Sequence, residues 1–195
     1  MINILIILMY RKITKKRKNY FQRCFKNNPD VKCYFRHWEN KNLIKTIKDK
    51  KLDGIILSGS EYRILEDHKK IATLPDYIFK SNIPILGICY GFQYLIKYFG
   101  GNTYINTFKT QKMQKYYKNI KINKPFKVSV QNYYFNHHDY IVKLPSKWKV
   151  SLKYKKIIYM AYYKHMIGIQ FHPEQSYNKV GKIFFNLWIN YIKKY

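Results

Sequence analysis

The feature that most constrains this chain is a cysteine held between two glycines, in the segment GICYG at residues 87–91. An apolar run at 83–86 precedes it, and apolar residues recur at helical spacing over 92–99. Together they predict a buried strand, a sharp turn and a helix. Glycine two residues to either side is the spacing of a nucleophile elbow, because side chains there would collide with neighbouring segments. We therefore expect Cys89 at a helix N-terminus, where unpaired amides favour the thiolate.

A second motif near the end of the chain supplies candidates for a base and its partner. The segment GIQFHPE at 168–174 ends an apolar run in a histidine and a carboxylate two residues apart. A nucleophilic cysteine needs a base, and that base needs a group that orients it. His172 is expected to take the thiol proton and Glu174 to hold the imidazole in the required tautomer. The alternative is a structural cysteine and a structural histidine, and the presence of all three residues favours the triad.

Apolar runs and amphipathic segments alternate through the first half of the chain. We expect strands at 2–10, 31–35, 52–57 and 83–86, and helices at 20–26, 43–50, 64–74 and 92–99. This alternation predicts an α/β fold, a mostly parallel open sheet with helices on both faces. Alternating β-branched and aromatic residues after 102 predict a small antiparallel addition, and a helix is expected at 180–191. A length of 195 residues predicts a single domain, 1–195.

Three strings in a fixed order carry a resemblance to a known family. They are LSGS, GICYGFQ and GIQFHPE, and with them the chain resembles the class I (triad) glutamine amidotransferases, most closely the glutaminase part of GMP synthases. The resemblance implies a flavodoxin-like fold and the hydrolysis of L-glutamine to glutamate and ammonia. It implies that Cys89 forms a glutamyl thioester, that His172 carries protons and that Glu174 orients His172. No cofactor is implied.

The resemblance also implies an oxyanion hole and a substrate site. The backbone amides of Gly59 and Tyr90 would form the hole. The implied substrate-binding residues are Ser60, Gln93, His137 and Asp139, the last two in the segment NHHDYIV. The family usually has a second glycine where this chain has Ser60, and a positive φ there would cost about 1 kcal/mol or more. Two adjacent histidines and an aspartate also suggest a metal site, but adjacent strand residues point to opposite faces, so no metal is expected.

The balance of charge is strongly basic, with 38 Lys and Arg against 10 Asp and Glu, a formal charge of +28. Such a surface would bind polyanions through counterion release, which leaves open a non-catalytic, nucleic-acid-binding relative of the family. The favoured interpretation is that the lysines are scattered, as an A+T-rich coding sequence would produce. The densest cluster, at 11–18, is expected in a loop. Any binding to nucleic acid is therefore expected to be non-specific.

The remaining sequence signals concern location and partners. Three cysteines without metal-ligand spacing, and no signal peptide, are typical of the cytoplasm, and the apolar opening is too short to span a membrane. The chain has no phosphate-binding G-x-x-x-x-G-K-[ST] loop. Together with the resemblance, this implies that the partner is a separate ATP-dependent synthetase subunit. A γ-glutamyl peptidase or hydrolase with the same triad remains the alternative enzyme.

Overall fold

A computed structural model of the protein describes residues 1–26, 28–65, 73–108, 114–176 and 178–195. The elements of the parallel half are β1 (Ile2–Leu8), α1 (Lys15–Phe25), β2 (Val31–His37), α2 (Leu43–Asp49), β3 (Gly54–Leu57), α3 (Tyr77–Lys80), β4 (Ile85–Ile88) and α4 (Tyr90–Gly100). A 3₁₀ turn (Asn102–Tyr104) follows, and then β5 (Ile105–Thr107), β6 (Gln114–Ile122), β7 (Val128–His137), β8 (Asp139–Ile141), β9 (Lys149–Tyr154), β10 (Ile157–Tyr163), β11 (Met166–Ile169) and α5 (Asn178–Ile192).

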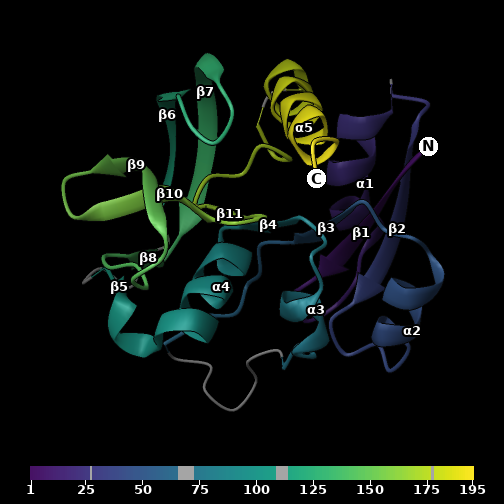
Figure 1. Ribbon diagram of the computed structural model, residues 1–195. Coiled ribbons are helices and arrows are strands. Elements are labelled where there is room, and N and C mark those ends of the chain that lie inside the picture. The colour runs from purple at the N-terminus through teal and green to yellow at the C-terminus, as the bar shows by residue number, and fades with distance from the viewer. Residues whose placement is uncertain (27, 66–72, 109–113, 177) are drawn as a thin grey trace.

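The main sheet joins a parallel half to an antiparallel half. Within the described residues its order is β2-β1-β3-β4-β11-β10-β8-β5, with β9 beside β10. The first five of these strands pair in parallel, and the others pair antiparallel. Helices α1 and α5 cover one face, and α2, α3 and α4 cover the other (Figure 1). The predicted mostly parallel open sheet with helices on both faces is confirmed.

The composition of β1 shows why this strand lies inside the sheet. Ile4, Ile6 and Leu8 belong to the core under α1 and α5, whereas Leu5 and Ile7 belong to the core under α2, α3 and α4. All five side chains are fully buried. A strand with a parallel neighbour on each side and helices over both faces favours apolar side chains, which accounts for the apolar run from Ile4 onward. Asn3, near the amino end of β1, is the exception, and its side chain donates to the Lys51 backbone oxygen at 3.3 Å.

The predicted antiparallel addition is present in two parts. Strands β5, β8, β9 and β10 extend the main sheet, whereas β6 and β7 form a separate two-stranded ribbon. The sequence predicted only a small antiparallel addition, whereas this ribbon spans nine residues in β6 and ten in β7, and its two faces differ. Tyr133 and Phe135 of β7 are buried, whereas Tyr117 and Asn119 of β6 face outward. Packing against the main body thus stabilises a ribbon whose alternation is only partly apolar.

The first helix begins earlier than the sequence suggested. It was expected at 20–26, after a basic loop, but α1 begins at Lys15, so half of the basic cluster is helical. The reason is a local cap: the side-chain oxygen of Thr14 accepts a hydrogen bond from the Arg17 backbone amide at 3.3 Å. Such a cap satisfies an otherwise unpaired donor of the first turn.

The helix predicted at 64–74 falls mostly outside the described residues, which break off after 65 and resume at 73. The segment that follows forms only the short α3. No helix in the described part of the chain combines the length and apolar character needed to cross a membrane.

The turn between β4 and α4 depends on both glycines of the GICYG segment. Cys89 has a φ of 51° and a ψ of −102°, a conformation uncommon for a residue with a side chain. A Cβ added at Gly91 would lie 2.3 Å from the backbone oxygen of Leu57, and one at Gly87 would lie 2.7 Å from that of Gly91. Helix α4 therefore lies directly against β3 and β4, as the collision argument from the sequence predicted.

We predict that Gly91→Ala lowers the free energy of unfolding by about 1–3 kcal/mol, because the new methyl group meets backbone that cannot move aside. Gly100→Ala is the matched control, since it lies in the same helix. Its Cβ would meet only the edge of the Pro145 and Tyr104 side chains, at 3.0 and 3.1 Å. Urea unfolding of both variants measures the difference. Equal stability of the two would show that the close approach at Leu57 does not constrain the turn.

Candidate active site

The candidate nucleophile, Cys89, lies where the carboxyl end of β4 turns into α4. Cys89 is only 4% exposed. Its Sγ lies 3.6 Å from the backbone oxygen of Asn136 and 3.4 Å from Nε2 of Gln170. Tyr90, the next residue, is the first of α4. The unpaired amides of a first helical turn carry partial positive charge, which favours a negative sulfur.

The candidate base and its partner form a buried pair just beyond β11. Nδ1 of His172 lies 2.7 Å from Oε1 of Glu174, and both side chains are almost fully buried. A carboxylate only accepts hydrogen bonds, so Nδ1 carries a hydrogen and Nε2 is left to exchange protons. Within the described part of the chain, Nε2 of His172 makes no hydrogen bond. Gln175 donates from Nε2 to the same Oε1 at 3.2 Å.

Three other segments fix the backbone around this pair. The His172 amide donates to the Tyr134 backbone oxygen at 2.8 Å, which ties the pair to β7. The Ser176 hydroxyl donates to the His172 backbone oxygen at 2.7 Å and accepts from the Tyr134 amide at 3.0 Å. Arg23 of α1 donates to the Glu174 backbone oxygen at 2.7 Å. Sequence reasoning did not find these supports, because nothing local in the sequence marks them.

The electrostatics of the pair favour a protonated imidazole. Burial by itself lowers the pKa of His172, but the negative charges of Glu174 and of Cys89 outweigh it and raise the pKa well above 6.5. The backbone agrees with this coupling: the Cys89 amide donates to the Ile169 backbone oxygen at 2.7 Å, and Cys89 and His172 both contact β7, at the backbone oxygens of Asn136 and Tyr134. The structure thus brings Cys89, His172 and Glu174 together. An imidazolium and a thiolate stabilise each other at such a site, and the thiolate is the reactive form.

The loop after β3 lies against the histidine. A Cβ at Gly59 would come within 2.8 Å of Cε1 of His172, so the imidazole needs a glycine there. The suspected strain at Ser60 is absent, since Ser60 is not among the described non-glycine residues with positive φ. Its hydroxyl instead donates to the Met9 backbone oxygen at 2.7 Å and accepts from the Tyr62 amide at 2.9 Å. Ser60 therefore fixes the loop to the end of β1.

The other expected substrate residues lie beside Cys89 but also hold the fold together. Nε2 of Gln93 donates to the Asp139 backbone oxygen at 2.6 Å. Nδ1 of His137 lies 3.1 Å from that same oxygen, and burial lowers the pKa of His137 to about 4. The Asp139 carboxylate accepts from the Ile64 amide at 3.0 Å. No described group of three or more His, Cys, Asp and Glu side chains is arranged to hold a metal ion.

The space around Cys89 is small. A cavity of about 20 Å³ lies between the loop after β3 and the segment at 137–139. It has room for about one water molecule, so a side chain the size of glutamine would require its wall to move. A larger cavity of about 370 Å³ opens on the other side of His172 and is bordered by α1.

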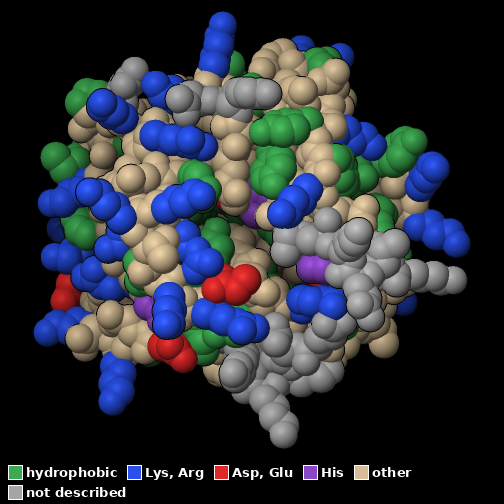
Figure 2. Space-filling view, turned by 180° about the vertical axis from the view of Figure 1, so that it is seen from behind, with side chains coloured by type: hydrophobic (Ala, Val, Ile, Leu, Met, Phe, Trp, Pro, Cys, Tyr) green, Lys and Arg blue, Asp and Glu red, His purple; other side chains and the backbone are tan. Residues whose placement is uncertain are grey.

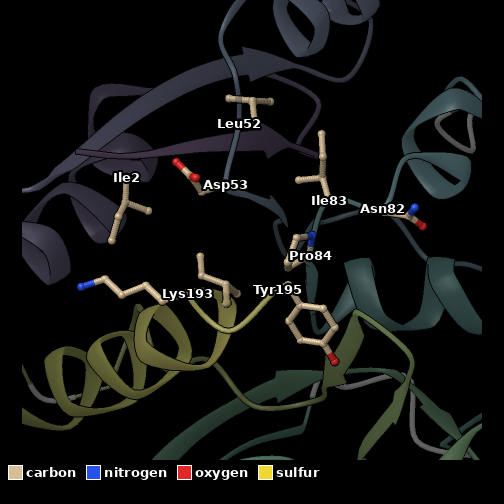
Figure 3. Close-up of a pocket in the computed structure, with 9 residues that line it drawn as sticks. Ile2, Leu52, Asp53, Asn82, Ile83, Pro84, Lys193 and Tyr195 are labelled. Carbon is tan, nitrogen blue, oxygen red and sulfur yellow. The ribbon is translucent and has the colours of Figure 1, made fainter.

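A separate cavity of about 360 Å³ lies at the opposite end of the sheet (Figure 3). Ile2 and Pro84 border it at the amino ends of β1 and β4, and Asp53 and Lys193 are its charged side chains. Ligands of open parallel sheets bind at the carboxyl ends of the strands, where Cys89 lies. Neither a cysteine nor a histidine is among the residues that line this cavity, so we assign the chemistry to the Cys89 end.

Comparison with known proteins agrees with this arrangement. The family model described as "Glutamine amidotransferase class-I" matches residues 14–190. GMP synthase [glutamine-hydrolyzing] of Wigglesworthia glossinidia brevipalpis is 30% identical over 172 residues, which cover 81% of this chain and 32% of that protein. A glutamine-hydrolyzing GMP synthase subunit of Thermoplasma acidophilum is 29% identical over 151 residues, 74% of each chain. This chain thus spans about a third of the first of these relatives.

A solved structure gives the same fold. A GMP synthase subunit from Thermoplasma acidophilum superimposes with a TM-score of 0.77 at 23% sequence identity. The match covers 100% of this chain and 96% of that one. At this identity the likeness establishes the fold.

We predict that Glu174→Gln lowers the pKa of His172, because the substitution removes a negative charge that raises it. The imidazole carbon resonances of labelled histidine, followed by NMR across pH, measure this value. Glu61→Gln is the control: Glu61 borders the larger cavity beside His172 but is not among the charges that shift its pKa. A His172 pKa that is the same in Glu174→Gln as in the control would contradict the assigned coupling.

Proposed function

The chain belongs to the class I glutamine amidotransferase family, and we propose that it hydrolyses L-glutamine to glutamate and ammonia through a thioester on Cys89. The observation that carries this proposal is the convergence of Cys89 with the buried pair of His172 and Glu174, 2.7 Å apart. Cys89 comes from the turn after β4, and His172 and Glu174 come from the segment after β11. They are proposed to serve as nucleophile, base and orienting group.

In the proposed reaction the Cys89 sulfur attacks the side-chain amide carbon of glutamine, and His172 takes up the thiol proton at Nε2. The amide oxygen becomes an oxyanion, which the backbone amides of Gly59 and Tyr90 are proposed to stabilise. His172 then returns its proton to the departing nitrogen, which leaves as ammonia, and a glutamyl thioester remains. Water, deprotonated by His172, attacks the thioester, and glutamate and the free cysteine are formed.

The proposed partner is a separate ATP-dependent synthetase that receives the ammonia. One of the relatives is by name only one subunit of a GMP synthase, so an enzyme that makes GMP is the expected recipient. The open side of His172 offers a place for such a protein. There the 370 Å³ cavity is lined by Lys16, Arg17 and Tyr20 of α1 and by one carboxylate, Glu61.

Charge indicates the chemistry of the partner's surface. Arg17 pairs with Glu61 at 3.2 Å, so these two charges cancel. Lys16 and the adjacent Lys15 are both exposed and give this surface a net positive charge. Figure 2 shows Lys and Arg side chains crowded over the side of the molecule that carries α1, with few carboxylates among them. We therefore propose that the synthetase docks over α1 with an acidic surface.

We predict that Cys89→Ala abolishes glutamine hydrolysis and that a glutamine-like affinity label modifies Cys89 alone. Burial raises the pKa of Cys24 and of Cys33 to about 12, so both thiols stay protonated and react poorly. Cys33→Ala is the matched control and should retain turnover and labelling. Mass spectrometry locates the label, and the release of glutamate measures turnover.

Two outcomes would contradict this proposal. Turnover in Cys89→Ala, or equal labelling of Cys24 or Cys33, would exclude Cys89 as the nucleophile. Hydrolysis of a γ-glutamyl dipeptide in preference to glutamine would identify the chain as a γ-glutamyl hydrolase with the same triad.

For the partner, we predict that a co-expressed synthetase subunit from the same source, supplied with XMP and Mg-ATP, raises glutamine hydrolysis. The double variant Lys15→Glu, Lys16→Glu should raise the synthetase concentration needed for half of this effect by about tenfold, because it reverses charge at the contact. Lys194→Glu, at the other end of the molecule, is the control. The activation should also weaken as salt is added. If turnover alone is already high and no synthetase changes it, the partner proposal is wrong.

A further inference from the structure

A fully buried glutamine, Gln170, lies directly beside the candidate nucleophile. It follows the last residue of β11, and its backbone amide donates to the Tyr159 backbone oxygen at 2.8 Å. Nε2 of its side chain lies 3.4 Å from Sγ of Cys89, and Oε1 accepts from Nε2 of Gln93 at 3.2 Å. Both ends of this buried amide thus have partners, as a buried polar group requires.

The orientation of the two amides follows from a single backbone oxygen. Nε2 of Gln93 lies 2.6 Å from the Asp139 backbone oxygen, which can only accept. The nitrogen of Gln93 must face this oxygen, because the reverse orientation would place two oxygens in contact. Its second hydrogen then points to Oε1 of Gln170. The nitrogen of Gln170 is consequently directed at the sulfur. The Asp139 backbone oxygen of β8 thus sets the donor and acceptor direction of each hydrogen bond from Gln93 to Cys89.

We propose that Gln170 is a positioning residue for the nucleophile, which donates an amide hydrogen to Cys89 Sγ and so favours the thiolate, and that Gln93 orients it. This inference rests on the proposed function only in taking Cys89 as the nucleophile. The amide hydrogen of Gln170 binds a charged thiolate more strongly than a neutral thiol, and this difference favours the thiolate.

The Asn136 backbone oxygen, the second neighbour of the sulfur, makes a hydrogen-bond donor at Gln170 important for a thiolate. The Asn136 backbone oxygen, 3.6 Å from Sγ, can accept from a thiol but repels a thiolate. A thiolate at this position therefore depends on donors elsewhere, which are Gln170, a protonated His172 and the start of α4. Gln170 and the Asn136 oxygen, 3.4 and 3.6 Å from Sγ, together restrain the position of the sulfur.

The test uses the pH dependence of Cys89 alkylation by iodoacetamide, which requires no glutamine. Gln170→Met keeps the length of the side chain and removes the donor. We expect the midpoint of the alkylation profile to rise by about one pH unit, so that the rate falls by up to about tenfold at pH values below the wild-type midpoint. Absorbance of the thiolate at about 240 nm follows the same change. Gln131→Met, an equivalent substitution on the outer ribbon, should leave the profile unchanged.

A second pair of variants separates positioning from structure. Gln170→Glu is isosteric and places an oxygen beside the sulfur, so it should shift the midpoint at least as far, and it serves if Gln170→Met does not fold. Gln93→Met removes only the orienting partner and should shift the midpoint in the same direction by a smaller amount. An equal or larger shift in Gln93→Met would contradict the proposal that Gln93 acts on Cys89 through Gln170.

An unchanged alkylation profile in folded Gln170→Met would overturn the proposal, even if that variant lost glutaminase activity. A wild-type protein that does not turn over glutamine would instead contradict the proposed function. If Gln170→Met still raised the midpoint of the alkylation profile relative to that wild type, the role of Gln170 would remain supported. The two failures are therefore distinguishable in the same set of proteins.

Discussion

At Cys89 the chain adopts a φ of 51° and a ψ of −102°, and the position of the sulfur among the other groups of the site depends on that turn. The conformation is unfavourable for a residue with a side chain, so it persists only because β4 and α4 are both fixed by packing. Glycine at 87 and 91 lets the helix lie directly on the neighbouring strands. The same contact that buries α4 places the sulfur at the carboxyl edge of the sheet, so packing energy maintains the strained backbone of the proposed nucleophile.

The proposed base, His172, is positioned differently, by hydrogen bonds that come from distant parts of the chain. Glu174 orients the His172 side chain, while β7, the turn after His172 and Arg23 of α1 hold the backbone around the pair. Burial alone would drive the proton off the imidazole, and the two neighbouring negative charges retain it. Because the charges of Cys89 and His172 interact, a change in the charge of the sulfur also changes the protonation of the imidazole.

The antiparallel strands contribute more to the site than their position at the edge suggests. Strand β7 of the separate ribbon brings the Asn136 backbone oxygen to the sulfur of Cys89, and β8 of the main sheet brings the Asp139 backbone oxygen to Gln93. His137 and Asp139 were expected to bind substrate, and that role remains a prediction. The structure shows them held in hydrogen bonds inside the fold, beside a cavity of about 20 Å³.

The sequence by itself determined the elements with strong local signals. The apolar runs predicted the parallel strands, the glycines around Cys89 predicted the turn, and the spacing of His172 and Glu174 predicted a pair whose side chains the structure shows 2.7 Å apart. Only the tertiary structure decided the start of α1, the length of the ribbon and the surroundings of the sulfur. Gln170 is one polar residue at the end of an apolar strand, and its partners lie 77 and 81 residues away in the chain. No local pattern encodes such contacts, because they exist only once the sheet has brought β4, β8 and β11 together.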